Sequence, residues 1–449
     1  SSMWLVLQYF GVGTCGMPSP SRRTLLQALT GTVALIAGCQ SDTESTASQT
    51  AKSTTSTSTT TTLSATSMTE EPKTGGIGGD PGSLPEMVWP LPDRGPSNSA
   101  YLPVGPNFDK APAVGWEFAP IHPDEDYYSP QYLHPVIAGD TIYAVNALVY
   151  GTNVARPDKQ YLRAVSADSK ERWTVGISAG DSTPVPSQPA IYDEFVLLGL
   201  EQDLRAYERS TGDTAWTVGV DEDIHTIVPT SQRIIVRASR AIVAVVDRTI
   251  QWTVPYEEYP SAMAISPDTV FVGSSKRISA LDPDTGKIRW REDLPAVSDG
   301  WGVSSLVAVP GGVLARQHSG HVYAYTTAGV EVWRTPGIDD NFATDGTFLY
   351  AGKAGSIRAL RVANRETVWE RTCDDISGCT GAVDVLDIAV TENSVIAALE
   401  NGLVVDLDAR TGSSRWTKQV PITIQGLAMT DSAIYGIGDM DDPIIQFTA

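Results

Sequence analysis

A tryptophan recurs through most of the chain at the end of a strand, hairpin and strand pattern. Successive tryptophans lie 36 to 57 residues apart, and the series is Trp116, Trp173, Trp216, Trp252, Trp290, Trp333, Trp369 and Trp416. A period of about 40 residues, enough for four short strands, is typical of a propeller blade. The repeat therefore predicts an all-β propeller.

The unit that ends at Trp290 has the most complete pattern. Apolar and β-branched residues alternate over 269–273 and 277–281, and Asp and Gly follow at turn positions over 282–286. Alternation of this kind predicts strands, and the short polar segments between them predict turns. Helical periodicity is missing throughout the repeats, so we expect each unit to be a small antiparallel sheet.

The number of units predicts how the ring closes. Seven units have four strands each, whereas only three strands (422–429, 433–437 and 444–447) follow Trp416. The segment 113–118, which carries Trp116, can supply the missing outer strand and leave no open sheet edge between the termini. We therefore expect eight blades, because a seven-bladed ring would leave either Trp116 or the last three strands unexplained.

The eleven residues 280–290, Ala-Leu-Asp-Pro-Asp-Thr-Gly-Lys-Ile-Arg-Trp, resemble the tryptophan-docking motif of the pyrroloquinoline-quinone-like (PQQ-like, or quinoprotein-like) propeller repeat family. The resemblance implies that the small first residue and the turn glycine make room for a Trp between neighbouring blades. All eight tryptophans are then structural docking residues. The repeats differ: 244–252 is two residues shorter, and Asp406 replaces the small first residue in the unit that ends at Trp416.

The N-terminal part predicts export. Two arginines at 22–23 precede an apolar run that ends in Ile-Ala-Gly-Cys at 36–39. Residues 17–39 thus resemble a twin-arginine lipoprotein signal, which implies lipidation of Cys39 and a membrane-anchored extracytoplasmic protein. Residues 1–16 look like an upstream, non-native extension.

Two further segments precede the ring. Residues 40–83 are rich in Ser and Thr and cannot bury enough apolar area to order themselves, so we expect a disordered stalk. Residues 84–112 are expected to be an irregular lead-in, and 113–449 to be the propeller.

The net charge is strongly negative. The chain has a formal charge of −21 and a pI near 4.6. Such a surface repels the phosphates of nucleic acids, which are therefore not expected as partners. Together with abundant aspartate, the charge resembles that of proteins from salt-loving archaea, in which high salt screens the self-repulsion.

Few residues carry a signal for site chemistry. Cys373 and Cys379 are expected to form a disulfide, with free thiols as the alternative. Trp301 lies outside the repeat register, where it either packs over one face or stacks on a ligand. His318 with His321, and the acidic run 439–442, offer groups that bind metal ions, but neither has a complete ligand set, so no metal is expected.

Two functions follow from these observations. No phosphate loop, nucleophile elbow or metalloprotease motif occurs in the sequence, which favours a non-catalytic, monomeric surface scaffold. Its partner would be an unidentified protein or small ligand at a propeller mouth, as the resemblance to a bacterial outer-membrane assembly lipoprotein implies. The alternative is a PQQ-dependent dehydrogenase acting on an alcohol or sugar, with Ca²⁺ holding the quinone; the adjacent-cysteine bridge common in those enzymes is absent.

Overall fold

The computed structural model describes the part of the chain that the propeller prediction concerns. The described residues are 87–89, 91, 95, 97–119, 128–150, 159–177, 186–295, 302–338, 342–353, 355–438 and 442–449. They all belong to the second of two compact units, Gly76–Ala449. Several predictions concern residues outside the described ones: the extension 1–16, the signal 17–39 with Cys39, the segment 40–83, Trp301 and the acidic residues 439–441.

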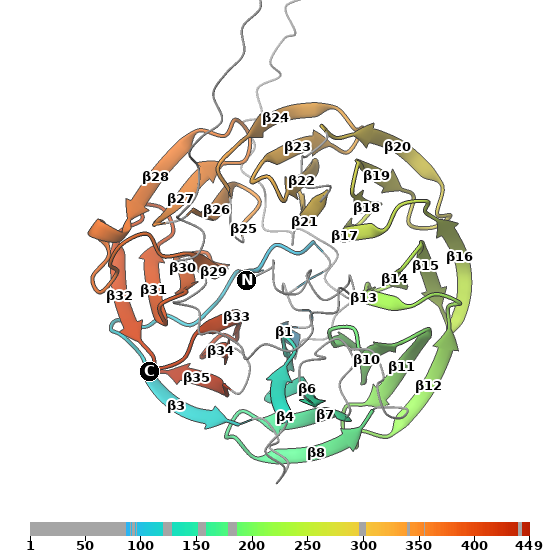
Figure 1. Ribbon diagram of the computed structural model, residues 1–449, viewed down its shortest axis with the longest axis horizontal. Helices are drawn as coiled ribbons and strands as arrows, with labels where there is room; N and C mark the ends of the chain where they lie inside the picture. Colours follow the sequence, from blue (N-terminus) through green and yellow to red (C-terminus); the bar gives the residue numbers. More distant parts are fainter. Residues whose placement is uncertain are drawn as a thin grey trace, which may run out of the picture. The chain divides into compact units, whose positions relative to one another are not determined.

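Eight sheets follow one another around a central axis (Figure 1), and we call the region enclosed by their inner strands the channel. This arrangement confirms the predicted eight-bladed all-β propeller. Among the described residues there is a single 3-10 helix, η1 (Cys373–Asp375), and no helix suited to span a membrane.

The blades are numbered in chain order. Blade 1 consists of β1 (Met87–Trp89), β4 (Tyr128–Tyr132), β5 (Val136–Ala138), β6 (Thr141–Tyr150), β7 (Lys159–Ser166) and β8 (Glu171–Gly176). Blade 2 consists of β9 (Ala190–Tyr192), β10 (Phe195–Leu200), β11 (Asp203–Glu208) and β12 (Thr214–Gly219). Blade 3 consists of β13 (Ile224–Pro229), β14 (Ile234–Ala238), β15 (Ala241–Val246) and β16 (Thr249–Pro255). Blade 4 consists of β17 (Pro260–Ser266), β18 (Thr269–Ser274), β19 (Arg277–Leu281) and β20 (Ile288–Asp293).

The second half of the ring continues the pattern. Blade 5 consists of β21 (Val303–Val309), β22 (Gly312–Gln317), β23 (Val322–Thr326) and β24 (Glu331–Thr335). Blade 6 consists of β25 (Phe342–Thr344), β26 (Phe348–Lys353), β27 (Ser356–Arg361) and β28 (Thr367–Thr372). Blade 7 consists of β2 (Tyr101–Leu102), β29 (Val385–Thr391), β30 (Ser394–Leu399), β31 (Leu403–Asp408) and β32 (Ser414–Gln419). Blade 8 consists of β3 (Ala113–Phe118), β33 (Ile424–Met429), β34 (Ile434–Gly438) and β35 (Ile444–Thr448).

The N-terminal strand β3 closes the last blade, as predicted. It pairs antiparallel with β35, from Ala113 opposite Thr448 to Phe118 opposite Ile444. It also contacts blade 1, because the Arg163 guanidinium lies 4.1 Å from the centre of the Phe118 ring. The segment that precedes blade 1 and the C-terminal strand therefore meet in one sheet, and blade 8 gains its outer strand.

The repeated tryptophans join consecutive blades. In six of them the indole Nε1–H donates to a main-chain carbonyl of the next blade, at 2.6 to 3.0 Å; these are Trp116, Trp173, Trp252, Trp290, Trp333 and Trp369. Trp216 and Trp416 make no such bond within the described chain. Trp333, Trp369 and Trp416 are buried, whereas the other five are half-buried. The eight positions thus share a place in the blade but not an equal degree of burial.

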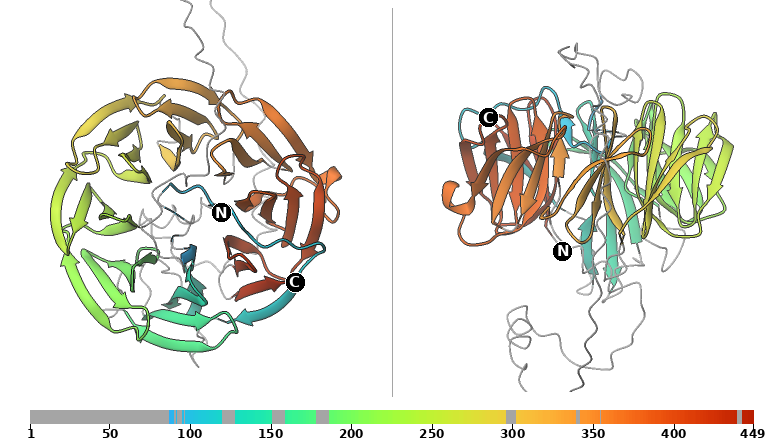
Figure 2. Two further views of the ribbon diagram at one scale, coloured as in Figure 1. Left: turned by 180° about the vertical axis from the view of Figure 1, so that it is seen from behind. Right: turned by 90° about the horizontal axis from the view of Figure 1, so that it is seen from above.

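The lead-in contains two short strands and runs along the channel. β1 pairs antiparallel with β5, the inner strand of blade 1, and β2 pairs parallel with β29 of blade 7. Figure 2 shows the blue segment passing from the channel to the outside of blade 8, where it becomes β3. On this path Phe108 packs against Trp416, with ring centroids 6.2 Å apart.

Candidate functional site

β-Bulges interrupt the inner strands near one end of the channel. Register shifts in blades 3, 4, 5, 7 and 8 leave one extra residue at the same place in each strand: His225, Ser261, Ser304, Leu386 and Gln425. A bulge takes its extra residue out of the regular strand register and bends the strand, which re-aims side chains. We call this end of the channel, formed by His225, Arg237, Tyr259 and the bulged strand ends, the bulge mouth.

Glycines let the inner strand of the next blade pack closely beside the bulges. Gly273 of β18 lies against Val303, so that a Cβ there would come within 2.6 Å of the valine side chain. Gly199 and Ile224, and Gly352 and Val385, repeat this contact in other blades. The close approach places the bulges of blades 3, 5 and 7 at the same position relative to the preceding blade.

A cavity of about 260 Å³ lies along the inner strands beside the bulge mouth. Hydroxyl and amide groups supply most of its polar lining, and Arg237 is the one charged side chain among the described residues that line it. The lining residues are Leu91, Asn98, Gln188, Thr226, Ile227, Val228, Arg237, Ser261, Ala262, Met263, Ser304, Ser305 and Leu306. Such a surface can exchange neutral hydrogen bonds, but its described lining residues include no carboxylate and no nucleophile paired with a base.

Arg237 orients the polar groups at the mouth. Its Nη2 donates to the Thr226 hydroxyl at 2.6 Å, and its Nη1 donates to the Pro260 carbonyl at 2.7 Å and to the Tyr259 hydroxyl at 3.1 Å. The guanidinium carbon also lies 5.6 Å from the centre of the Tyr259 ring. Tyr259 is nevertheless 48% exposed, which is unusual for a large side chain held at both its ring and its hydroxyl.

His225 completes the cluster from the bulge of β13. Its Nε2 is 3.0 Å from the Ser239 hydroxyl, and its ring meets Tyr259 edge to face with centroids 5.2 Å apart. Burial, and secondarily the charge of Arg237, lowers the pKa of His225 to about 4. The imidazole is therefore neutral near pH 7 and does not act as a proton donor to a ligand there.

The lead-in fills part of the channel with main-chain and amide contacts. Asn98 Nδ2 donates to the carbonyls of Met263 and Leu306, at 2.6 and 3.2 Å. The carbonyls of the neighbouring lead-in residues accept one main-chain hydrogen bond each from blades 5, 6 and 7; the pairs are Ser97 with Ala308, Ser99 with Thr344 and Ala100 with Val390. The inner edges of these blades are thus bonded to the chain's own N-terminal segment.

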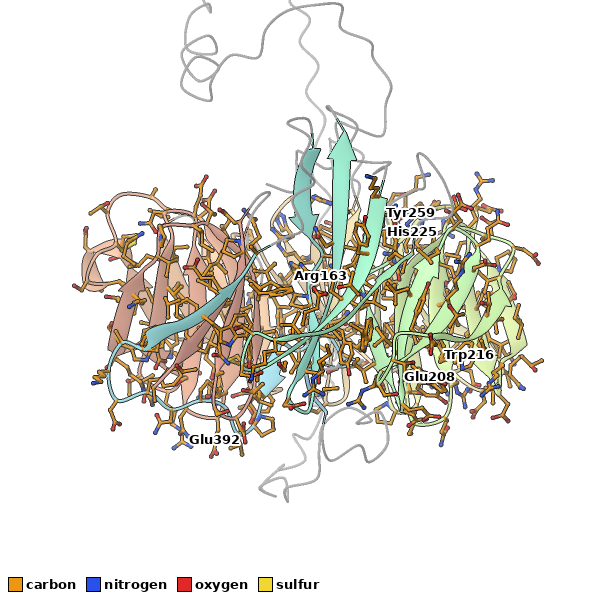
Figure 3. The ribbon with its side chains drawn as sticks, turned by 90° about the horizontal axis from the view of Figure 1, so that it is seen from below. Arg163, Glu208, Trp216, His225, Tyr259 and Glu392 are labelled. Carbon is orange, nitrogen blue, oxygen red and sulfur yellow. A yellow bond between two sulfur atoms is a disulfide. The ribbon has the colours of Figure 1, made fainter. Side chains whose placement is uncertain are left out.

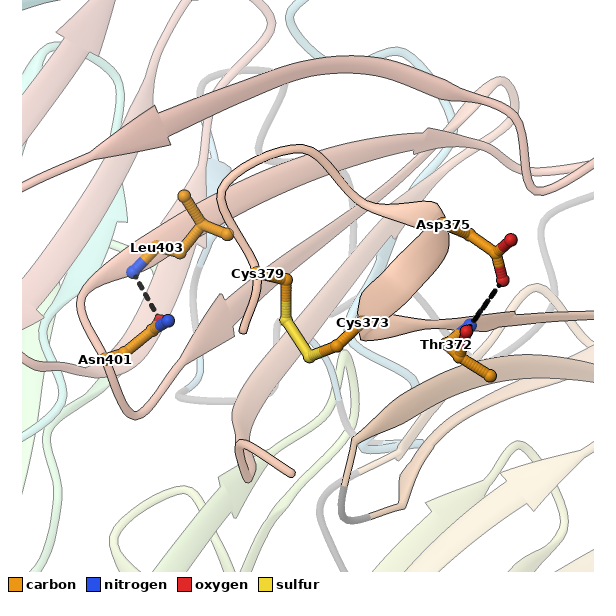
Figure 4. The surroundings of a disulfide bond; sticks show 6 residues. All are labelled: Thr372, Cys373, Asp375, Cys379, Asn401 and Leu403. Atoms are coloured by element: carbon orange, nitrogen blue, oxygen red, sulfur yellow. Dashed lines mark hydrogen bonds between the residues drawn. A yellow bond between two sulfur atoms is a disulfide. The ribbon is translucent and has the colours of Figure 1, made fainter. Parts of the chain in front are cut away.

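The predicted site residues are dispersed rather than gathered. Cys373 and Cys379 form a disulfide in the link between blades 6 and 7, beside the Thr372–Asp375 capping box (Figure 4). His321 Nδ1 is 3.2 Å from the Ser319 hydroxyl. No group of three or more potential metal ligands occurs within the described ranges. Trp301 and residues 439–441 lie outside those ranges.

Sequence reasoning missed the bulge mouth. His225, Arg237 and Tyr259 belong to no motif. His225 is bonded to Ser239, 14 residues away, and Arg237 to Tyr259, 22 residues away. The available signal was an alignment of the repeats by their inner strands, in which a polar residue follows an apolar one at 224–225, 260–261 and 303–304.

Comparison with known proteins agrees with this architecture. A family model described as outer membrane protein assembly factor BamB matches residues 158–300 and 274–431. The chain belongs to this family. Its membership accounts for the PQQ-like repeat recognised in the sequence. A search among curated proteins finds no match.

Solved structures share the fold at low identity. BamB from Moraxella catarrhalis is 15% identical, with a TM-score of 0.56 over 74% of this chain and 99% of that one. The quinohemoprotein alcohol dehydrogenase from Comamonas testosteroni is 12% identical, with a TM-score of 0.58 over 80% of each chain. A europium-containing methanol dehydrogenase is 11% identical, with a TM-score of 0.59 over 79% of this chain and 90% of that one. These likenesses extend to the fold alone, because similar propellers carry unrelated functions.

Proposed function

We propose that the protein is a non-catalytic scaffold that binds a protein partner at the bulge mouth. The observation that carries the proposal is the path of the lead-in. Its main chain bonds to the inner edges of blades 5, 6 and 7, and Asn98 bridges blades 4 and 5. A ligand must then use the rim of the channel rather than its depth, and a rim suits a macromolecule better than a small substrate, for which an enclosed pocket is the rule.

The shape of blade 1 also supports binding on the side of the ring where the bulge mouth lies. β4 pairs with the far half of β6, from Tyr128 opposite Tyr150 to Tyr132 opposite Asn146, whereas β5 pairs with the near half. The blade therefore extends past the ring on the side where Tyr259 and His225 lie (Figure 3). A raised blade on the same side of the ring as an exposed aromatic residue adds contact area for a partner there.

The channel lining is a poor match for a Ca²⁺-held quinone. Ca²⁺ sites in proteins are built mainly from carboxylate and carbonyl oxygens, and neither Asp nor Glu is among the residues of the described part of the chain that line the cavity beside the bulge mouth. The lead-in residues Leu91 and Asn98 also form part of that lining. Both features support a binding role over the dehydrogenase alternative.

We also propose that the protein is exported by the twin-arginine route and retained through lipidated Cys39. The motif at 22–39 and the following Ser- and Thr-rich segment support this assignment. An anchored ring on a tether would present its faces to partners outside the membrane.

Co-purification from native membranes tests the binding role. We would compare the full chain with Tyr259→Arg, which disrupts the bulge mouth, and with Val332→Arg, a matched change on β24 at a side chain of similar exposure, 55%. A partner captured by the full chain and by Val332→Arg, but lost with Tyr259→Arg at an unchanged melting temperature, is the expected result. Equal capture by both variants, or repeated capture of nothing, would overturn the proposal.

A dye-linked dehydrogenase assay after incubation with PQQ and Ca²⁺ tests the alternative. We expect no turnover of alcohols or sugars. Quinone-dependent turnover would show that the protein is a dehydrogenase and not a non-catalytic scaffold.

A further inference from the structure

Blade 3 has the shortest docking turn of the described repeats, and this changes the surroundings of the preceding tryptophan. Between Ala244 and Trp252 the segment is two residues shorter than between Ala280 and Trp290. Asp247 and Arg248, with φ values of 49° and 62°, make a tight turn where the longer repeat has Pro-Asp-Thr-Gly. No glycine of blade 3 therefore reaches Trp216 in blade 2.

A turn glycine covers the tryptophan ring at four other blade junctions. A Cβ built on that glycine would come within 2.6 to 2.8 Å of the ring, and only a residue without a side chain fits there; the pairs are Gly212 on Trp173, Gly286 on Trp252, Gly329 on Trp290 and Gly412 on Trp369. Trp216 also lacks the indole hydrogen bond to the next blade that six of the tryptophans make within the described chain. The shortened turn of blade 3 therefore leaves the Trp216 ring in the wall of a pocket.

The space left by the short turn is a pocket of about 220 Å³ between blades 2 and 3. Its walls are aromatic and aliphatic, and its rim is charged; the lining residues are Tyr192, Asp193, Glu194, Phe195, Trp216, Ile234, Val245, Asp247 and Arg248. Phe195 meets the Trp216 ring edge to face, with centroids 5.9 Å apart. Phe195 thus fixes the orientation of the Trp216 ring, and the ring forms part of the pocket wall.

The charges around the pocket favour a cation. Three carboxylates, those of Asp193, Glu194 and Asp247, line the pocket together with one guanidinium, that of Arg248. Partial burial, and secondarily Glu194, raises the pKa of Asp193, and burial with the nearby carboxylates raises that of Tyr192. The Arg248 guanidinium carbon stands 5.9 Å from the centre of the Trp216 ring, so the face of this indole already attracts a cation.

We propose that the pocket over Trp216 is a docking site for a basic side chain, arginine or lysine, presented by a protein partner. The ammonium or guanidinium group would take the place of the Arg248 guanidinium over the indole, and the carboxylates at the rim would neutralise it. The site lies at the end of blade 3 opposite the bulge mouth, because Val245 pairs with Ile234 near the pocket whereas Arg237 pairs with Ile242 near His225. It is therefore a second surface and does not depend on what binds at the bulge mouth.

The binding test uses a defined probe and the indole N–H signals in ¹⁵N–¹H NMR spectra of the full chain. The probe is acetyl-Gly-Arg-Gly-amide, compared with its lysine analogue and with the neutral citrulline analogue. The Trp216 signal is assigned with Trp216→Phe, and the Trp290 signal, whose ring Gly329 covers, serves as the internal control. We expect the arginine and lysine peptides to shift the Trp216 signal alone, and citrulline to bind at least threefold more weakly.

Two variants locate the site. Asp247→Asn should weaken binding of the arginine peptide about threefold or more, whereas Asp268→Asn, which removes an acid from a turn of blade 4, should leave binding unchanged. Grafting residues 282–287 in place of 246–249 lengthens the turn by two residues, and should close the pocket and abolish the shift while the other indole signals stay in place. Equal binding of citrulline, an equal effect of the two Asn variants, or a shift that survives the graft would each overturn the proposal.

Discussion

Replacing Trp369 with alanine should remove one of the strongest contacts between blades. Trp369 lies on β28, is 6% exposed and donates its indole N–H to the Ala409 carbonyl of blade 7 at 2.9 Å. Gly412 of that blade lies flat on the ring, and Tyr350 contacts it from its own blade with ring centroids 6.1 Å apart. The substitution therefore opens a cavity at the interface between blades 6 and 7.

The magnitude follows from the buried area. A tryptophan buries roughly 150–250 Å², which at about 25 cal/mol per Å² corresponds to about 4–6 kcal/mol. The indole hydrogen bond adds about 1 kcal/mol, and relaxation of the neighbours recovers part of the sum, since Trp→Ala changes in cores cost about 3–5 kcal/mol. We expect Trp369→Ala to lower the free energy of unfolding by about 4 kcal/mol. Trp290→Ala, at a half-buried site with the same kind of bond, should cost about half as much.

Urea unfolding at constant salt, followed by circular dichroism, measures both values. Trp369→Phe keeps part of the ring and should fall between the native chain and the alanine variant. A loss below about 1 kcal/mol for Trp369→Ala would refute the docking argument. So would an equal or larger loss for Trp290→Ala, because burial would then not determine the strength of the contact.

Three further predictions concern other parts of the chain. Deleting residues 113–118 should lower the melting temperature and cause aggregation at high salt, whereas deleting 41–83 should change neither; equal melting curves would contradict closure by β3. Burial raises the pKa of Asp406 to about 7, against the lowering effects of Ser394 and Arg415. The folded chain then holds a proton that the unfolded chain releases from about pH 4, so stability should fall as the pH rises from about 4 through 7. Asp406→Asn should abolish this fall and stabilise the fold at pH 8 by up to about 4 kcal/mol, which melting curves at pH 4 and pH 8 would check. Cys39→Ser should release the protein from membranes without changing its melting temperature, and persistent membrane association on fractionation would point to another anchor.

Much of the ring could be predicted from local patterns. The alternation in 269–273 and 277–281 encodes strands because side chains on a strand point to opposite faces with a period of two. The spacing of the tryptophans encodes the blade, and the count of strands after Trp416 encodes closure by 113–118. Each of these signals lies within about one blade's length of sequence or depends on simple counting.

The candidate sites were harder to predict, to different degrees. The two-residue deletion before Trp252 is visible in the sequence, but its consequence, an uncovered ring on Trp216, depends on which blade lies next to which. Asp406 is visible as an exception to the docking motif. Its raised pKa arises first from burial in the packed blade, at 2% exposure, and secondarily from the nearby Asp408 carboxylate.

The repeats by themselves therefore determined the number of blades, the closing strand and the family of this protein. Only the tertiary structure decided the path of the lead-in and the location of the two candidate binding surfaces. Asn98 bonds to carbonyls 165 and 208 residues away, at Met263 and Leu306. Main-chain carbonyls are the same in every residue, so no sequence pattern marks them as partners, and such contacts exist only once the blades have assembled around the channel.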